Sequence, residues 1–321
     1  MLKYATKLFL LCVLSVQLGC IATKKNISPL PNAKEGYVEA GGGVKLFYRL
    51  LGAGADTLVM IHGGPGLTMD YFLHDLAPLA AHHALLFYDQ RGTGRSTLVS
   101  DSMSLDAQRF VEDVEAIRKQ FGIAQITLFG HSWGSAVVAR YAMSYPEHLK
   151  RMIIVGALPL QQYQLTEAFR QLEMKRDSST LKRMRELRAA RFEDPGNAEV
   201  CLAYYTLWFQ PFYGIPNTSK LSKGDFCSGT LESRRNKMTS VDKFTMASLG
   251  QWDWRTSLTR VKVPALVIHG TLDPLPLDGA KGWGAVLQNS QLLLLDGVGH
   301  FPYLEAPDQF FKAINQFLEK R

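Results

Sequence analysis

Short apolar runs alternate with longer amphipathic segments in two parts of this chain, residues 36–158 and 257–321. Runs of about four to eight apolar residues are typical of buried strands, whereas apolar residues at every third or fourth position indicate helices. Strands that alternate with helices predict an α/β fold, in which helices cover both faces of a mostly parallel sheet. The predicted strands are 37–40, 44–50, 57–61, 84–88, 125–129, 151–155, 264–268 and 291–295, and the predicted helices are 71–81, 104–121 with Ser104 as N-cap, one after Ser132, and 307–318.

The alternation is interrupted between residues 159 and 256, where no strand pattern is found. This segment contains charge-rich helical sequence followed by the aromatic run 204–209. Neither flank has enough strands for a domain of its own, so one core with a helical cap insertion fits better than two tandem domains. Because the insertion follows the carboxyl end of a strand, where open α/β sheets bind ligands, we expect it to cover an active site.

The first 19 residues have the pattern of a signal peptide. Lys3 and Lys7 form a basic region, which the apolar run 8–16 follows. That run is too short to span a bilayer, which requires about 20 residues. The pattern predicts export.

Gly19 and Cys20 end this segment and resemble a bacterial lipobox, although Gln17 stands where a lipobox normally has leucine. The resemblance implies that Cys20 becomes the lipidated N-terminus and that residues 20–35 form a tether between membrane and domain. We therefore expect a location in the bacterial periplasm or cell envelope, with a lipid anchor at Cys20.

Export places the remaining cysteines in an oxidising compartment. Of the four cysteines, Cys12 lies in the signal peptide and Cys20 is the lipidation candidate, which leaves Cys201 and Cys227. A disulfide between them is one hypothesis, and two buried free thiols are the alternative.

Basic residues exceed acidic residues modestly, with 36 Lys+Arg against 29 Asp+Glu. They are scattered, and no K/R-rich run, RNA-binding motif or zinc-ligand spacing accompanies them. We therefore expect a solvated charged surface and no nucleic-acid partner. The sequence leaves the oligomeric state open.

The sequence G-H-S-W-G at 130–134 follows directly after the predicted strand 125–129. A G-x-S-x-G motif between a strand and a helix forces its serine onto a sharp turn that exposes the hydroxyl at the top of the sheet. Ser132 is thus a candidate nucleophile. Because a serine hydroxyl needs a base to take its proton, the motif predicts a histidine and an acid elsewhere in the chain.

An acid and a histidine follow later predicted strands. Asp273 comes after strand 264–268, and His300 ends the loop after strand 291–295. The order Ser, Asp, His is that of the α/β-hydrolase triad. In this hypothesis Ser132 attacks a carbonyl carbon, His300 transfers the proton and Asp273 orients the imidazole. Two weaker candidates for the acid are Asp296 and Asp278.

A glycine-rich loop, H-G-G-P-G at 62–66, follows the predicted strand 57–61. Such a loop can present backbone N–H groups to an oxyanion, together with the N–H of Trp133, the residue after the serine. A phosphate-binding loop is the alternative for any glycine cluster, but neither G-K-[ST] nor G-x-G-x-x-G is present here. We expect His62 to brace the loop.

Three motifs together resemble those of the proline iminopeptidases in the α/β-hydrolase superfamily: 62–66, D-Q-R-G-T-G-R-S at 89–96, and G-H-S-W-G-S at 130–135. The resemblance covers most of the core. It implies removal of an N-terminal residue, often proline, from a short peptide, without metal or cofactor. It also implies Gly64 and Trp133 as the oxyanion donors.

The resemblance is weakest in the insertion. An aminopeptidase must bind the α-ammonium of its substrate, and burying that charge requires a carboxylate. Members of that family supply glutamates from the cap, one in a W-x-x-W-E sequence, whereas the corresponding run 204–210 has no glutamate. Candidate pocket residues, with packing between cap helices as the alternative, are Tyr204, Tyr205, Trp208 and Phe209. Candidate carboxylates, each with a solvated helix position as the alternative, are Glu232, Glu167, Glu173 and Glu199.

These features predict a metal-independent serine hydrolase that acts on a small peptide as an aminopeptidase of the proline iminopeptidase type. The first alternative is a carboxylesterase or lactonase for small neutral esters, which would need the same triad but no carboxylate for an ammonium. A binding protein without catalysis is a third hypothesis, and the complete set of Ser132, Asp273 and His300 argues against it.

Overall fold

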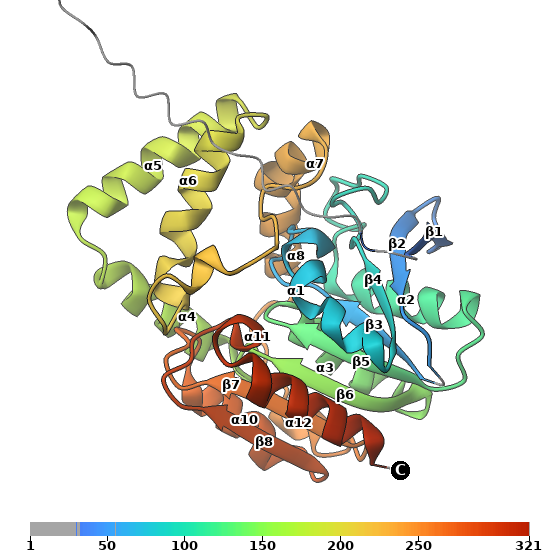
Figure 1. The fold of residues 1–321 in the computed structure, drawn as a ribbon. Helices are drawn as coiled ribbons and strands as arrows, with labels where there is room; N and C mark the ends of the chain where they lie inside the picture. The colour runs from blue at the N-terminus through green and yellow to red at the C-terminus, as the bar shows by residue number, and fades with distance from the viewer. Residues whose placement is uncertain (1–29, 31–32, 55, 321) are drawn as a thin grey trace, which may run out of the picture.

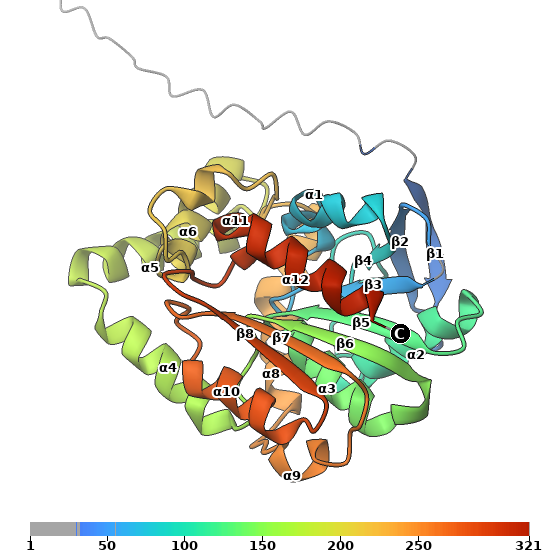
Figure 2. The ribbon, with the colours of Figure 1, turned by 60° about the horizontal axis from the view of Figure 1, so that its bottom comes forward.

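The computed structural model describes residues 30, 33–54 and 56–320, which form an eight-stranded sheet flanked by helices (Figure 1, Figure 2). The strands are β1 (Lys34–Glu39), β2 (Lys45–Leu51), β3 (Thr57–Ile61), β4 (Ala84–Tyr88), β5 (Ile126–His131), β6 (Leu149–Val155), β7 (Ala265–Gly270) and β8 (Ser290–Leu295). Their order is β1-β2-β4-β3-β5-β6-β7-β8. β2 is antiparallel to β1 and β4, and the other neighbours are parallel. The predicted α/β class is confirmed.

The α-helices divide between the core and the segment that joins β6 to β7. In the core they are α1 (Leu73–Leu76), α2 (Ala107–Gln120), α3 (Gly134–Ser144), α10 (Leu277–Val286), α11 (Pro302–Glu305) and α12 (Pro307–Glu319). Between β6 and β7 they are α4 (Gln162–Met174), α5 (Ser178–Glu193), α6 (Ala198–Phe209), α7 (Leu231–Asn236), α8 (Asp242–Ser248) and α9 (Arg255–Leu258).

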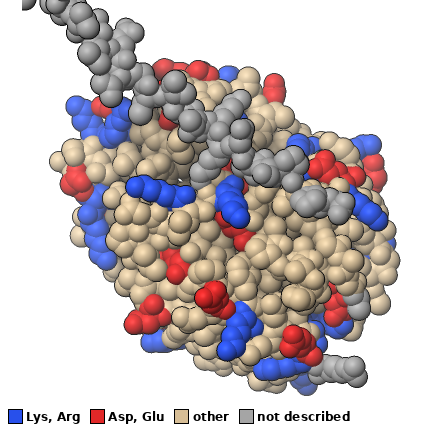
Figure 3. Space-filling model, viewed as in Figure 1, with Lys and Arg blue, Asp and Glu red and all other residues tan. Residues whose placement is uncertain are grey.

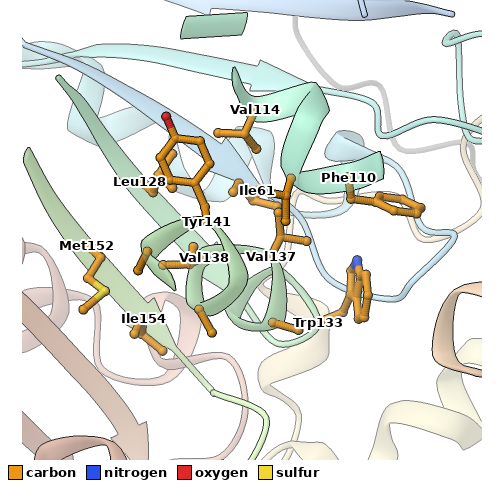
Figure 4. Close-up of a cluster of buried hydrophobic side chains, with 14 of the residues drawn as sticks. Ile61, Phe110, Val114, Leu128, Trp133, Val137, Val138, Tyr141, Met152 and Ile154 are labelled. Atoms are coloured by element: carbon orange, nitrogen blue, oxygen red, sulfur yellow. The ribbon is translucent and has the colours of Figure 1, made fainter. Parts of the chain in front are cut away.

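Two layers of buried apolar side chains hold the helices on the sheet. Successive strand residues point to opposite faces, so Val59 and Ile61 enter one layer while Leu58 and Met60 enter the other. The first layer also contains residues of α2, α3 and α10, and the second contains residues of α1, α11 and α12. Figure 4 shows part of the first layer, in which side chains of α2 and α3 pack near Ile61 and Leu128.

Two predicted helices have different boundaries in the structure. The predicted N-cap Ser104 is wrong, because α2 begins at Ala107 and the carboxylate of Asp106 accepts a hydrogen bond from the backbone N–H of Gln108. The predicted helix 71–81 is divided into α1 and two flanking 3₁₀ segments. Pro78 lies at the start of the second segment, where it lacks the N–H that a continuous helix would need.

The segment between β6 and β7 corresponds to the predicted insertion 159–256. Its described residues form helices α4 to α9 and contribute no strand to the sheet. Helices α4, α5 and α6 stand beside one end of the sheet (Figure 1, Figure 2). A disulfide joins Cys201 of α6 to Cys227, with their Cα atoms 6.0 Å apart, which confirms the first of the two hypotheses for these cysteines.

The N-terminal predictions fall mainly outside the described residues. The predicted signal peptide 1–19 and Cys20 lie there, as does most of the predicted tether 20–35. β1 begins at Lys34, so the last two residues of that range belong to the sheet. No helix in the part of the chain that the structure describes is both long and apolar enough to cross a bilayer. On the face drawn in Figure 3, basic and acidic side chains are interspersed, consistent with the scattered charge of the sequence.

Candidate active site

Ser132 occupies a strained turn between β5 and α3. Its φ of 55° lies in the left-handed region, which is uncommon for a residue other than glycine. Its backbone N–H donates to the carbonyl oxygen of Val155 over 2.9 Å, which ties the turn to β6. A Cβ at Gly130 would lie 2.6 Å from the carbonyl oxygen of Gly134, and one at Gly134 would overlap the carbonyl oxygen of Ile61. The two glycines of the motif are therefore required by close backbone contacts.

His300 and Asp273 form a buried pair beside this turn. The imidazole Nδ1 lies 2.7 Å from Oδ2 of Asp273, and Oδ1 of the same carboxylate accepts a hydrogen bond from the N–H of Leu275 over 2.9 Å. Burial tends to raise the pKa of Asp273, but the nearby histidines His300 and His269 and the hydrogen bonds lower it below its usual value. The ionised carboxylate fixes Nδ1 as the protonated nitrogen, which leaves Nε2 to accept a proton.

Ser132 and His300 line the same cavity. The Ser132 hydroxyl makes no hydrogen bond to His300, or to any other of the described residues, so the proton-transfer contact is not formed in this structure. Contacts of this kind are often long in unliganded active sites and tighten when substrate binds. The structure therefore brings Ser132 and His300 to one site, without a hydrogen bond between the serine hydroxyl and the imidazole.

The two rival acids lie away from the imidazole. Asp296 is exposed and accepts a hydrogen bond from the Thr271 hydroxyl over 3.1 Å. Asp278, at the start of α10, is exposed, and its Oδ1 lies 3.8 Å from Nζ of Lys281. Neither carboxylate contacts His300, which leaves Asp273 as its acidic partner among the described residues.

Two residues that line the cavity have backbone N–H groups without a partner among the described residues. Gly64 has a φ of 126°, and a Cβ there would lie 2.9 Å from the backbone nitrogens of Gly66 and Leu67. Gly64 and Trp133 line the cavity together with Ser132. Within residues 30, 33–54 and 56–320, neither the N–H of Gly64 nor that of Trp133 has an acceptor. Unpaired donors of this kind suit the oxygen of a tetrahedral intermediate.

Gln90 joins the glycine-rich loop to the serine turn. Its side-chain amide donates to the carbonyl oxygen of His62 over 2.8 Å and accepts from the indole N–H of Trp133 over 2.9 Å. The backbone N–H of Gln90 also donates to Nε2 of His62, whose pKa falls to about 4 because the ring is buried. His62 is thus a neutral bracing residue. Gln90 lies within the motif 89–96, but this bracing role was not predicted from the sequence.

A second connection runs from the same loop to His300 through two buried side chains. The backbone N–H of Gly63 donates to the hydroxyl of Tyr71 over 2.7 Å, that hydroxyl lies 2.6 Å from Nδ1 of His131, and Nε2 of His131 lies 3.0 Å from the carbonyl oxygen of His300. A carbonyl can only accept, so Nε2 of His131 carries the proton and Nδ1 accepts from Tyr71. Burial lowers the pKa of His131 to about 3, so the ring is neutral, as this arrangement requires. Tyr71 and His131 were not found from the sequence.

The cavity has a volume of about 870 Å³ and a largely aromatic wall. Its predicted pocket residues are brought together on α6, where the rings of Tyr204 and Trp208 stack 6.1 Å apart and those of Tyr205 and Phe209 stack 5.7 Å apart. Phe226 adds a further ring 4.5 Å from that of Phe209. The cavity is thus continuous from Ser132 to the helices of the insertion.

Glu232 is not among the residues that line this cavity. It lies on α7 with an exposed side chain, where the structure gives it the solvated helix position that was the alternative. Two other carboxylates line the cavity, Glu193 at the end of α5 and Asp242 at the start of α8. Both carboxylate oxygens of Asp242 accept hydrogen bonds from Lys237, over 2.8 and 3.0 Å, whereas Glu193 forms no ion pair with any described residue.

The described residues contain no group of three or more histidine, cysteine, aspartate or glutamate side chains placed to hold a metal ion. The Asp273–His300 pair beside Ser132 can support the attack of an activated hydroxyl on a carbonyl group, with an oxyanion site beside it.

Comparison with known proteins agrees with this geometry. The family described as alpha/beta hydrolase fold matches residues 56–307. A proline iminopeptidase of Saccharolobus solfataricus is 28% identical over 298 residues, which cover 90% of this chain and 93% of the relative. A proline iminopeptidase of Thermoplasma volcanium is 28% identical over 308 residues, which cover 91% of this chain and 98% of the relative.

Solved structures show the same fold. The crystal structure of a proline iminopeptidase from Mycobacterium smegmatis has a TM-score of 0.64 and 20% identity, and covers 89% of this chain and 98% of its own. A thermophilic esterase from Thermogutta terrifontis has a TM-score of 0.65 and 17% identity, and covers 90% of this chain and 99% of its own. At such low identity these likenesses show the architecture alone.

Proposed function

This chain belongs to the alpha/beta hydrolase fold family as a hydrolase similar to proline iminopeptidases, and we propose that its reaction passes through an acyl-enzyme on Ser132. One arrangement carries the proposal. His300, which is paired with the buried Asp273, and the strained turn of Ser132 line one cavity. Gly64 and Trp133 line it too, and their N–H groups have no acceptor among the described residues.

The proposed reaction has two halves. The oxygen of Ser132 attacks the carbonyl carbon while Nε2 of His300 takes its proton, and the N–H groups of Gly64 and Trp133 hold the oxyanion. When the tetrahedral intermediate collapses, the leaving amine or alcohol receives the proton from His300. A water molecule then attacks the acyl-enzyme with His300 again as the base, which releases the acid and restores the serine. Each oxyanion donor is worth about 3 kcal/mol of transition-state stabilisation in comparable enzymes.

The leading substrate class is a short peptide from which an N-terminal proline, or a similar residue, is released. The relatives named proline iminopeptidase support it, since the match covers about 90% of this chain. The aromatic wall of α6 offers apolar surface to a pyrrolidine ring. Glu193, whose side chain is exposed, is the cavity carboxylate that forms no ion pair with a described residue, and we propose that it binds the substrate's α-ammonium.

The charge of the cavity favours a second candidate, hydrolysis of a small carboxylic ester or lactone. Of the residues that the structure describes, only two carboxylates line the cavity, and Lys237 already forms an ion pair with Asp242. A neutral ester would need the same serine chemistry without a partner for an ammonium. The two candidates differ in whether a free amine on the substrate matters.

We further propose that the protein is exported to the bacterial periplasm or cell envelope and anchored through a lipid on Cys20. The N-terminal sequence pattern supports export, and so does the Cys201–Cys227 disulfide, because stable disulfides are typical of oxidising compartments. Cells grown with a labelled fatty acid should yield labelled protein from the native chain and unlabelled protein from Cys20→Ser. Equal label in both would contradict the anchor.

Replacing Asp273 by Asn should lower kcat by about 10⁴-fold, because the amide no longer holds the imidazole in the tautomer that accepts a proton at Nε2. Asp296→Asn is the matched control, since its carboxylate is exposed and bonded to Thr271. It should leave kcat nearly unchanged. Steady-state kinetics on one substrate compares the two variants, and a larger loss in Asp296→Asn would reassign the acid.

Glu193→Gln should raise KM for a free-amine substrate such as proline 4-nitroanilide by about tenfold or more, because it removes a charged partner of the ammonium. Turnover of 4-nitrophenyl acetate should be unaffected. Glu186→Gln, on the exposed side of the same helix and paired with Arg183, is the control. If native enzyme hydrolyses proline 4-nitroanilide and its N-acetyl derivative equally well, the aminopeptidase assignment fails and the ester candidate replaces it.

A further inference from the structure

Three arginines of α5 line the cavity at intervals of three residues: Arg185, Arg188 and Arg191. This spacing places them on one face of the helix, turned towards the substrate space. Arg185 and Arg188 are exposed, as is usual for the residue type. Arg191 is different, because only 7% of its surface is accessible.

Arg191 is a buried cation without an anionic partner. Its guanidinium carbon lies 4.3 Å from the ring centre of Tyr204 and 4.7 Å from that of Tyr205. One of its N–H groups donates to the Tyr205 hydroxyl over 3.3 Å. No carboxylate in the described part of the chain forms an ion pair with it, and the rest of its five N–H donors have no acceptor there.

Buried arginines are ordinarily paired, as another arginine of this protein shows. The guanidinium of Arg91, 4% exposed, binds both carboxylate oxygens of the buried Asp113, over 2.6 and 2.8 Å. Contact with aromatic rings offsets only part of the cost of burying a cation. The Arg191 guanidinium has no anionic partner among the described residues. At the wall of a substrate cavity it is therefore available to an anionic ligand.

Neither of the two carboxylates that line the cavity pairs with Arg191, so the position of its anionic partner is open to a ligand. Lys237 lies near the glycine-rich loop, where its ammonium donates to the carbonyl oxygen of Pro65 and to both carboxylate oxygens of Asp242. That carboxylate is therefore already engaged. Glu193, the other cavity carboxylate, forms no ion pair with Arg191 although it is two residues away on the same helix.

We propose that Arg191 binds a carboxylate of the substrate at a position remote from the scissile carbonyl. The planar fork of N–H donors in arginine matches the two oxygens of a carboxylate. The proposal rests on the proposed hydrolysis at Ser132 and narrows its substrates to short peptides or esters that carry a free carboxylate. The carboxylate has two possible sources, the C-terminus of a di- or tripeptide on the leaving-group side, or the far end of an acyl group.

Two substrate pairs distinguish the sources. Prolylglycine and prolylglycinamide differ only in a carboxylate on the leaving-group side. The 4-nitrophenyl monoester of glutaric acid and that of its monoamide differ only in a carboxylate on the acyl side. Native enzyme should prefer the acid of at least one pair by about tenfold or more in kcat/KM, as expected for a charge-assisted hydrogen bond. The pair that shows the preference identifies the source.

The preference should disappear in Arg191→Gln and persist in Arg183→Gln, an exposed position of the same helix that does not line the cavity. Arg191→Lys, which keeps the charge but loses the fork, should retain part of it. A measurement on native enzyme alone guards against a misfolded variant. N-acetylglycine should inhibit turnover of a neutral ester at least about tenfold more strongly than N-acetylglycinamide, by the same charge-assisted contact.

Equal kcat/KM for acid and amide in both pairs, or a preference that survives in Arg191→Gln, would overturn the carboxylate site. Equal inhibition by N-acetylglycine and its amide would also count against it. Failure of the proposed function is recognised separately, because native enzyme would then hydrolyse neither member of either pair nor the neutral ester. Normal turnover of neutral esters without any acid preference would retain the hydrolase and remove only the site at Arg191.

Discussion

The left-handed backbone of Ser132 is the constraint on which the rest of the site depends. A non-glycine residue keeps such a conformation only where its surroundings fix it. Here α3 approaches β5 and β3 so closely that only glycine fits at positions 130 and 134, and β6 holds the N–H of Ser132. The hydroxyl is thereby presented above the carboxyl ends of the parallel strands, where open α/β sheets bind ligands.

Bracing residues extend this constraint to the neighbouring loops. Gln90 connects the loop of Gly64 to the indole of Trp133, and Tyr71 with His131 connects the same loop to the backbone of His300. In both links each donor meets an acceptor. In the second link this requires a neutral His131 ring, and burial keeps that ring neutral. We infer that the oxyanion donors, the serine and the imidazole are held as one unit, so that little reorganisation is needed when charge develops on the substrate.

The sequence was sufficient for features that depend on local pattern. The alternating runs predicted the parallel sheet, and Asp273 and His300 were found because each closely follows a strand end. Features that depend on contacts between distant segments were missed. Glu193 and Arg191 have the appearance of solvated residues on a charged helix, and only the packing of α5 beside the cavity reveals their position. Glu232 was proposed for the pocket for the same reason, because the sequence alone does not show that α7 contributes no residue to the cavity wall.

The most direct test is covalent labelling with a fluorophosphonate, followed by mass analysis of the intact protein and its peptides. The account predicts a single adduct on the native chain, mapped to Ser132, and none on a folded Ser132→Ala variant. An unlabelled native protein, or an adduct that persists in Ser132→Ala, would contradict it.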